Sequence, residues 1–375
     1  MGRLSTYLDH AATTPVRPEV VEAMAPFAAD RFGNASGGHR LARDARTALE
    51  DARDVVAAAL AADPSDVVFT SGGTEADNLA VLGPLGAGPT TIVTSAVEHP
   101  AVLEPARAAA RLGFAHVEAP VDAAGAVDVD RLAGLLDDDV AVVSVMLANN
   151  EVGTVQPLDQ VVDVVRRLAP RAVVHTDAVQ AAAWLDVARL AAGADLVSVS
   201  AHKIGGPKGA GALVARVPIR PMVHGGGQER ERRSGTHDVA GAVGLATALV
   251  CAAADREADA DRVRALRDRL ADGLLAVGGV VESAPRDRVL PGHCHLQFSG
   301  VNQEELLVLI DRDGVCAAAG SACASGALEP SHVLLAMGVA DPTTAVRFTL
   351  GHTTTDADVD RALAVVPAAV VRLRG

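Results

Sequence analysis

Two apolar, β-branched segments in the middle of the chain each end in residues that can carry chemistry. Residues 172–176 precede Asp177, and residues 195–199 precede the tetrapeptide Ser200-Ala-His-Lys203. Such segments are typical of buried strands in a parallel sheet, and open α/β sheets bind ligands at the carboxyl ends of their strands. The sequence therefore predicts that Asp177 and Lys203 lie close together, at the ends of neighbouring strands.

A lysine beside a carboxylate matches the needs of pyridoxal phosphate (PLP). This cofactor binds a lysine as a Schiff base and requires a carboxylate beside its pyridine nitrogen. The carboxylate keeps that nitrogen protonated, so that the ring can accept electrons from a substrate carbanion. Lys203 could instead be a surface lysine, but the apolar strand before it favours a buried ε-amine that loses its proton more readily.

Strand and helix patterns alternate through the first two thirds of the chain. Two amphipathic helices come first, at 18–32 and 39–62. Strands are then expected at 67–70, 91–94, 115–118, 140–147, 172–176 and 195–199, and helices at 74–82, 100–112, 129–136 and 158–168. Residues 211–216 are expected to add an edge strand. This alternation predicts an α/β fold with a doubly wound, mostly parallel sheet and helices on both faces.

The pattern changes near residue 240. One or two long helices are expected at 240–277, followed by strands at 295–298, near 315 and at 345–350, and by helices at 304–310, 331–337 and from 356 onward. These elements predict a smaller α+β domain. We expect residues 13–245 to form the large cofactor-binding domain and residues 246–375 the small C-terminal domain, with residues 1–12 packing beside it.

Composition narrows the class of protein. The net charge of −14, with one short basic cluster at 230–233, argues against binding to nucleic acid. The apolar stretch 140–148 is too short to span a membrane, and the first residues lack the apolar core of a signal peptide. The four cysteines form no C-x-x-C pair, so we expect neither a metal site nor disulfides. These features predict a cytoplasmic enzyme that does not bind membranes.

Three further strand ends carry candidate cofactor ligands. The glycine-rich turn at Gly73-Thr74 could bind a phosphate at a helix N-terminus, although for this motif taken alone an ordinary turn with Thr74 as N-cap is the favoured explanation. His99 could stack on the pyridine ring and move protons, or be a hydrogen-bonded structural residue. Asn150 could contact the cofactor's phenolic oxygen, or belong to a turn built on Asn and Gly.

Three more candidates lie in the later part of the chain. Ser234-Gly-Thr236 is a possible phosphate contact on a loop. Cys323 stands in the small-residue run 320–326, which predicts a flexible, exposed loop, although free cysteines are more often buried as small apolar residues. Arg347 could bind a substrate carboxylate in a bidentate manner or form a structural salt bridge. The other three cysteines, Cys251, Cys294 and Cys316, are expected to be packing residues.

Taken together, these motifs resemble those of the cysteine desulfurases of the NifS/IscS group, which are PLP enzymes of the aminotransferase class-V family with fold type I. The resemblance covers nearly the whole chain. It includes Tyr7-Leu-Asp-His-Ala-Ala-Thr-Thr-Pro15, Phe32-Gly-Asn-Ala-Ser36, Ser71-Gly-Gly-Thr-Glu-Ala-Asp-Asn78, Asn149-Asn-Glu-Val-Gly153, His175-Thr-Asp177, Ala201-His-Lys203, Gly225-Gly-Gly-Gln-Glu-Arg230, Arg233-Ser-Gly-Thr236 and Gly320-Ser-Ala-Cys323. The segment after Cys323 is similar to that of the first class of this group, which has the longer cysteine loop.

The resemblance implies a set of cofactor ligands. Lys203 would bind PLP and later act as the base, Asp177 would pair with the pyridine nitrogen, Gln180 with the phenolic oxygen, and His99 would stack on the ring. The phosphate would be bound by Gly73, Thr74, Ser200 and His202. Thr236 would reach the phosphate of a second subunit, which makes the enzyme a homodimer.

The resemblance also implies the reaction. Asn34, Asn150 and Arg347 would hold the substrate L-cysteine. Cys323 would attack the substrate sulfur, leaving alanine and an enzyme persulfide. The sulfur would then pass to a protein acceptor, either an iron–sulfur scaffold or a thiolation relay protein.

Two departures from the family pattern are visible. Ala201 stands where the family usually has Gly, which adds a methyl group beside the phosphate. The chain also ends soon after its last expected helix, without the longer tail that many relatives use near their scaffold partner, so the sulfur acceptor stays open.

Other functions fit parts of the sequence. The same fold supports a selenocysteine lyase, a kynureninase or a transaminase, but a transaminase needs no thiol at Cys323. A phosphate- or nucleotide-binding module would use Gly73-Thr74, yet it lacks a P-loop pattern and leaves Asp177 and Lys203 unexplained. A cysteine hydrolase that pairs Cys323 with a histidine is a third alternative.

Overall fold

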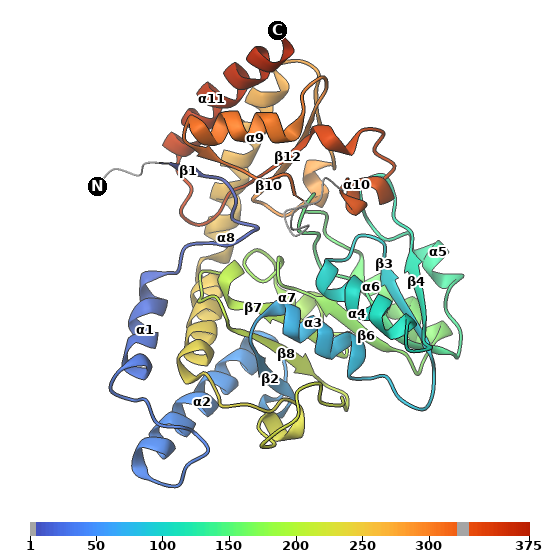
Figure 1. The fold of residues 1–375 in the computed structure, drawn as a ribbon, viewed down its shortest axis with the longest axis vertical. Helices are drawn as coiled ribbons and strands as arrows, with labels where there is room; N and C mark the ends of the chain where they lie inside the picture. Colours follow the sequence, from blue (N-terminus) through green and yellow to red (C-terminus); the bar gives the residue numbers. More distant parts are fainter. Residues whose placement is uncertain (1–4, 321–329) are drawn as a thin grey trace.

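The computed structural model describes residues 5–320 and 330–375 (Figure 1). In these residues the largest sheet has seven strands in the order β2-β8-β7-β6-β5-β3-β4. The strands are β2 (Val67–Thr70), β3 (Thr91–Ser95), β4 (Ala115–Ala119), β5 (Val140–Ser144), β6 (Val173–Asp177), β7 (Leu196–Ser200) and β8 (Gly211–Ala215). Strands β4, β3, β5, β6 and β7 are parallel to their neighbours in that row, which confirms the expected mostly parallel sheet.

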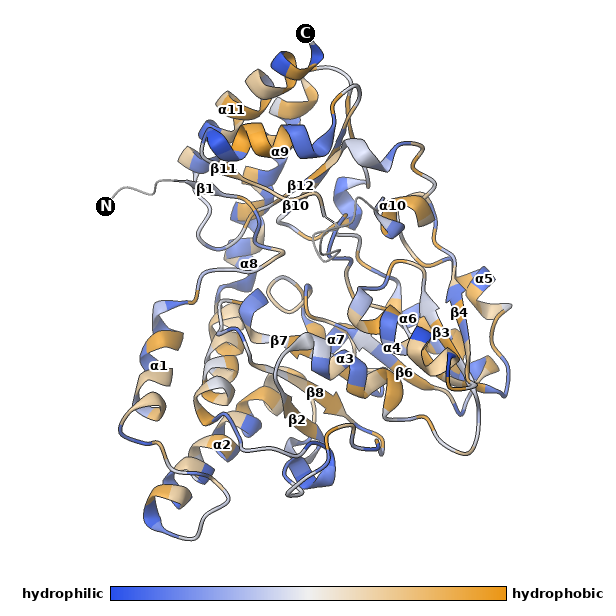
Figure 2. Cartoon of the chain, viewed as in Figure 1, coloured by the Kyte–Doolittle hydropathy of each residue, from blue (hydrophilic) through white to orange (hydrophobic). Residues whose placement is uncertain are grey.

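The expected place of β8 is wrong. This strand does not lie at an edge of the sheet but between β7 and β2, and it pairs antiparallel with both. All of its residues are buried, and Figure 2 shows it as largely hydrophobic. A short apolar strand looks the same in sequence whether it has one neighbour or two, so its position depends on the turn at 205–209, which returns the chain beside β7.

Helices cover both faces of this sheet. Alternate strand residues such as Val143, Val174 and Val197 pack in one core with α2 (Arg40–Ala59), α6 (Leu158–Leu168) and α8 (Val239–Leu275). The residues between them, such as Val142 and Leu196, pack against α4 (Pro100–Ala110) and α3 (Gly73–Leu82), respectively. The remaining helices of this part are α1 (Pro18–Ala28), α5 (Val129–Ala133) and α7 (Val187–Leu190). The sheet is therefore doubly wound, as the sequence predicts.

A second core lies above the large sheet in Figure 1. It contains an antiparallel sheet in the order β12-β10-β9, made of β12 (Ala345–Thr349), β10 (His293–Phe298) and β9 (Val280–Glu282). It is completed by α9 (Gln303–Arg312) and α11 (Asp356–Arg374), whereas α10 (His332–Ala336) packs in a separate cluster with Val97 and Met146. The N-terminal strand β1 (Thr6–Tyr7) pairs with β11 (Val315–Cys316), and Leu8 is part of this core.

The 37-residue helix α8 connects the two cores. Leu245 and Leu249 pack in the core of the large sheet, whereas Leu266 and Leu270 pack in the second core. The expected domain boundary at 245/246 therefore falls inside one continuous helix. Helix α8 is also long and apolar enough to cross a membrane by length and composition, but half of its most apolar window is buried inside the protein, as in a core helix.

A buried ion pair with Arg53 anchors the loop 224–238 to helix α2 and, through backbone hydrogen bonds, to the edge strand β2. Two Arg53–Glu229 contacts, Nη1–Oε2 of 2.8 Å and Nη2–Oε1 of 2.9 Å, join side chains that are 2% and 1% exposed. The backbone N–H of Phe69 and the ring of His237 also contact the Glu229 carboxylate, each at 2.9 Å.

Glu229, Arg230 and Glu231 have φ values of 49°, 55° and 65°, which non-glycine residues rarely adopt. The ion pair therefore holds a costly backbone conformation in place.

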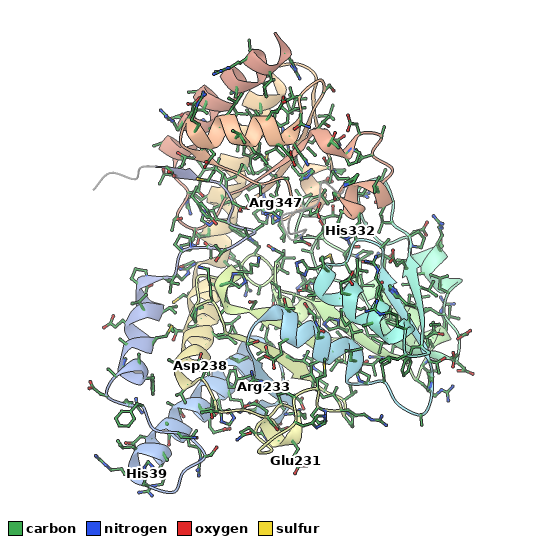
Figure 3. All side chains as sticks on the ribbon, viewed as in Figure 1. His39, Glu231, Arg233, Asp238, His332 and Arg347 are labelled. Atoms are coloured by element: carbon green, nitrogen blue, oxygen red, sulfur yellow. The ribbon has the colours of Figure 1, made fainter. Side chains whose placement is uncertain are left out.

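We expect Glu229→Gln to lower the free energy of unfolding by about 3–5 kcal/mol, because it leaves the buried Arg53 guanidinium with the half-exposed Glu50 carboxylate as its remaining counter-charge. Urea unfolding measures this loss. The matched control is Glu231→Gln, since Glu231 is exposed and shares the left-handed backbone (Figure 3); its effect should stay within about 0.5 kcal/mol. Equal losses in both variants would contradict the assigned role of the ion pair.

Candidate active site

A cavity of ≈ 300 Å³ opens at the carboxyl ends of the parallel strands. Ten of the residues predicted from the sequence line it: Gly73, Thr74, His99, Asn150, Asp177, Gln180, Ser200, His202, Lys203 and Arg347. Asn34 and Thr236 do not line this cavity within their own chain, and both are exposed. Cys323 lies outside the described residues. The structure thus brings most of the predicted site together.

Lys203 reaches the cavity from the 3₁₀ turn that directly follows β7. Its Nζ donates hydrogen bonds to the carbonyl oxygens of Ala11, at 2.5 Å, and Ala12, at 2.8 Å. Both carbonyls belong to the N-terminal segment, whose sequence motif carries no sign of this contact. The amine is therefore positioned by two parts of the chain about 190 residues apart.

Asp177 is the last residue of β6 and is 6% exposed. Its Oδ1 accepts a hydrogen bond of 2.8 Å from the backbone N–H of Val179. Burial raises the pKa of Asp177 to about 6, although the Val179 N–H and the charge of Lys203 act in the opposite direction. A cationic group placed beside Asp177 would favour its ionised form.

His99 is both a helix cap and a cavity residue. Its Nδ1 accepts a hydrogen bond of 3.1 Å from the backbone N–H of Ala101, at the start of α4. Burial, followed by the charges of Lys203 and His332, lowers the pKa of His99 to about 4. Since Nδ1 is an acceptor, the neutral ring carries its proton on Nε2. His99 can therefore be a hydrogen-bonded structural residue and still present its ring to a cofactor in the cavity.

The N-terminus of α3 forms the opposite end of the cavity. The alternative interpretation, in which Thr74 is the N-cap of this helix, is wrong, because Gly72 occupies the N-cap position and Thr74 lies in the first turn. Gly72 has a φ of 147°, which a side chain would strain, so the backbone N–H groups of the turn stay accessible. Next to the turn, the buried Ser200 Oγ has no hydrogen-bond partner among the described residues. A second cavity of ≈ 410 Å³ adjoins this end and includes Lys208.

Arg347 lines the side of the cavity that belongs to the second core. Its Nη2 forms an ion pair of 2.7 Å with Asp9 Oδ1, and its Nη1 donates to the carbonyl oxygen of Asn150 at 2.8 Å. The residue is 3% exposed, and its Nε has no partner within the part of the chain that the structure describes. Arg347 therefore makes a structural salt bridge and still keeps one buried N–H for a ligand.

Comparison with known proteins identifies the family. The model of the family "Aminotransferase class-V" matches residues 6–362. The chain is 47% identical to an "IscS-like cysteine desulfurase" of Mycobacterium tuberculosis, over 98% of this chain and 97% of that one. It is 42% identical to "Cysteine desulfurase NifS" of Azotobacter vinelandii, over 98% of this chain and 93% of that one. A solved "NIFS-LIKE PROTEIN" superposes with a TM-score of 0.92 at 35% identity, covering 98% of this chain and 100% of that one.

The chain belongs to the aminotransferase class-V family. Within this family it belongs to the NifS/IscS group, and its cofactor is PLP. The described residues fit PLP: Lys203 and Asp177 line one cavity, and the unpaired Ser200 hydroxyl and the start of α3 suit a phosphate. No group of three or more His, Cys, Asp or Glu side chains suited to a metal occurs in residues 5–320 and 330–375.

Two buried acids of this family member were missed by sequence reasoning. Asp77 on α3 lines the cavity and is 2% exposed, and Glu98, just before His99, is fully buried. Glu98 Oε1 accepts hydrogen bonds from Ser95 Oγ, at 2.5 Å, and from the backbone N–H of Met146, at 2.7 Å. Asp77 could have been identified from the sequence, because it is an acid on the apolar side of a predicted helix, with Ala76 and Ala80, which are buried in α3.

Burial raises the pKa of Glu98 to about 8, more than the Ser95 and Met146 hydrogen bonds lower it. Below about pH 4.5 both the folded and the unfolded state hold this proton, and between about pH 4.5 and 8 only the folded state does. Glu98 therefore makes the free energy of unfolding fall as pH rises through that range.

We expect Glu98→Gln to remove this pH dependence, because Gln copies the neutral acid in size and in its acceptor oxygen. Urea unfolding of both proteins should be measured at several pH values between 5 and 8. As pH rises, the free energy of unfolding of the variant should increase relative to that of the wild type, by at most about 1.4 kcal/mol per pH unit. Parallel stability curves across this range would mean that Glu98 is ionised in the folded protein.

Proposed function

We propose that the chain is a cysteine desulfurase that converts L-cysteine to L-alanine and passes the sulfur to Cys323. The observation that carries this proposal is the meeting of Lys203, Asp177 and Arg347 in one cavity, in a chain whose relatives are named cysteine desulfurases. The lysine and the carboxylate suit PLP, and the guanidinium suits an amino-acid carboxylate. A phosphate-binding module would need neither Asp177 nor Arg347.

The cavity residues predicted from the sequence divide the tasks toward the cofactor among them. When bound, PLP supplies a ring that withdraws electrons from the substrate's carbon atoms. Lys203 Nζ binds the cofactor and moves protons as the base, and Asp177 holds a proton at the pyridine nitrogen. Neutral His99 covers the ring, and Gln180 contacts the phenolic oxygen. Gly73, Thr74, Ser200 and His202 bind the phosphate.

The substrate binds beside the second core. The ion pair with Asp9 holds the Arg347 guanidinium in one orientation. The Nε–H of Arg347, which has no partner among the described residues, is therefore held in a fixed position for the substrate. Asn150, whose carbonyl accepts from Arg347, lines the cavity next to it. These two residues hold the carboxylate and amine of L-cysteine. Asn34, also assigned to the substrate, would have to act from a second chain, because it does not line the cavity of its own.

Sulfur transfer requires a thiolate, and the three described cysteines are poor candidates. Burial raises the pKa of Cys251 and Cys316, and it raises the pKa of Cys294 to about 12. Such thiols are inert as nucleophiles. Gly320, three residues before Cys323, lines the cavity. The Cys323 thiolate attacks the substrate sulfur, the S–S bond of a persulfide forms as the C–S bond breaks, and the carbon takes up a proton to give alanine.

The working enzyme is a cytoplasmic homodimer that delivers sulfur to a protein acceptor of iron–sulfur cluster assembly or thiolation. The loop 224–238, anchored by Glu229, carries the exposed Thr236. Arg233 of this loop binds Glu75 on α3 through contacts of 2.7 Å and 3.1 Å, and Glu75 borders the phosphate end of the cavity. A loop held in this way can present Thr236 to the phosphate of a second copy.

Cys323→Ala tests the sulfur transfer. The variant should keep the visible absorbance of bound PLP and still change its spectrum with L-cysteine, but it should yield no alanine, sulfide or persulfide above background. Cys251→Ala, Cys294→Ala and Cys316→Ala serve as controls and should turn over at nearly the wild-type rate. Desulfuration by Cys323→Ala at a comparable rate would favour a lyase of the selenocysteine type.

A hybrid dimer tests the shared site. Lys203→Ala and Thr236→Ala subunits, coexpressed with different tags, should form a dimer in which one of the two sites has both residues intact. After dialysis this hybrid should retain close to one PLP per dimer, whereas each parent dimer should retain much less. If the hybrid holds no more cofactor than the parents, Thr236 does not act across subunits.

A further inference from the structure

Asp77 reaches the PLP cavity from a different direction than Asp177. It projects from the buried side of α3, whereas Asp177 ends β6, and the two carboxyl groups line the same cavity. Both are almost completely buried, at 2% and 6% exposed. None of the cofactor or substrate tasks assigned above uses Asp77, so a second buried acid beside the cofactor lacks an explanation.

The contacts of Asp77 are with uncharged groups. The Ser198 hydroxyl on β7 hydrogen-bonds to its carboxyl group, and its Oδ1 lies 3.6 Å from His175 Nε2. The His175 ring lies between two hydroxyls, with Nδ1 2.8 Å from Ser144 Oγ and Nε2 3.0 Å from Ser198 Oγ. Burial lowers the pKa of His175 to about 3, so the ring is neutral at physiological pH.

Among the residues that the structure describes, the charged groups around Asp77 give it no counter-charge. Asp177 and Glu98 are acids, and both disfavour a negative charge on Asp77. The cavity cations are engaged elsewhere, since Lys203 donates to two backbone carbonyls and Arg347 pairs with Asp9. The other acid of the first turns of α3, Glu75, pairs with Arg233. Two like charges in one buried site cannot both be ionised at low cost.

Asp177 is the better site for the single charge. It accepts a backbone hydrogen bond from Val179 and is stabilised by the charge of Lys203. We propose that Asp77 and Asp177 share one negative charge beside the pyridine nitrogen, with the charge on Asp177 and a proton on Asp77 in the wild-type enzyme. This inference rests on the proposed role of Asp177 toward PLP. Burial, and then the charge of Asp177, raise the pKa of Asp77 well above its usual range, which agrees with a neutral acid.

The hydrogen-bond chain from Asp77 to Ser144 can report where the proton lies. With Asp77 protonated, its O–H donates to Ser198, the Ser198 hydroxyl donates to His175 Nε2, and His175 Nδ1–H donates to Ser144. With Asp77 ionised, every donor and acceptor is reversed and the His175 proton moves to Nε2. The tautomer of His175 therefore follows the charge of Asp77 without involving the reaction itself.

The test is a double-mutant cycle on the dissociation constant of PLP, measured by absorbance on the full-length dimer. Asp177→Asn should weaken PLP binding by about tenfold or more, and Asp77→Asn should weaken it by no more than about threefold, because Asn copies a neutral acid. In the Asp177→Asn protein, Asp77 becomes the remaining carboxylate. Adding Asp77→Asn there should therefore weaken binding by about a further tenfold or more.

Nitrogen-15 NMR of histidine-labelled protein should show His175 with its proton on Nδ1 in the wild type and on Nε2 in Asp177→Asn.

Glu98→Gln is the matched control, because it replaces a neighbouring buried acid that does not line the cavity. It should leave PLP affinity unchanged in both backgrounds. Equal losses for Asp77→Asn in the presence and absence of Asp177 would overturn the shared charge, as would a wild-type His175 proton on Nε2. A loss in the double variant without a loss in Asp177→Asn supports sharing while removing the proposed priority of Asp177. Unchanged affinity in all variants would overturn both the inference and the assigned role of Asp177.

Discussion

The parallel pairing of β6 with β7 is the constraint on which the site depends. The register places Asp177 opposite Ser198, so that β6 ends at its carboxylate while β7 continues for two residues into the turn that carries Lys203. Parallel strands end at the same side of a sheet, so every residue that follows one of them contributes to the same cavity. His99 and Asn150 reach the cavity in this way from the segments after β3 and β5.

Burial then decides the charge of the groups that the strands bring together. The pKa values of His99 and His202 fall to about 4 and that of Glu98 rises to about 8, in each case mainly because the charged form loses its hydration. The site therefore contains neutral imidazoles beside Lys203, and Glu98, just outside the cavity, is a neutral acid. In such surroundings, the few charges that remain interact strongly with a bound cofactor and substrate.

The N-terminal segment and α8 connect the site to the second core. Ala11 and Ala12 bind the Lys203 amine, and Asp9, two residues earlier, binds Arg347 on β12. A short stretch of chain thus contacts both the lysine assigned to the cofactor and the arginine assigned to the substrate. Helix α8 packs in both cores, so one continuous helix joins the second core to the sheet that carries the site.

The strand pattern and the polar residues after each strand could be predicted from the sequence, because side-chain periodicity and the geometry of parallel sheets are local rules. They were sufficient for the doubly wound sheet and for the meeting of Asp177 with Lys203. The sequence could not place β8 between two neighbours, since a buried strand has the same pattern at an edge or inside a sheet. It also could not show that Ala11 and Ala12 bind Lys203, or that Asp77 lines the same cavity as Asp177. Those contacts use backbone carbonyls and a helix side that acquire their partners only when segments distant in sequence pack together.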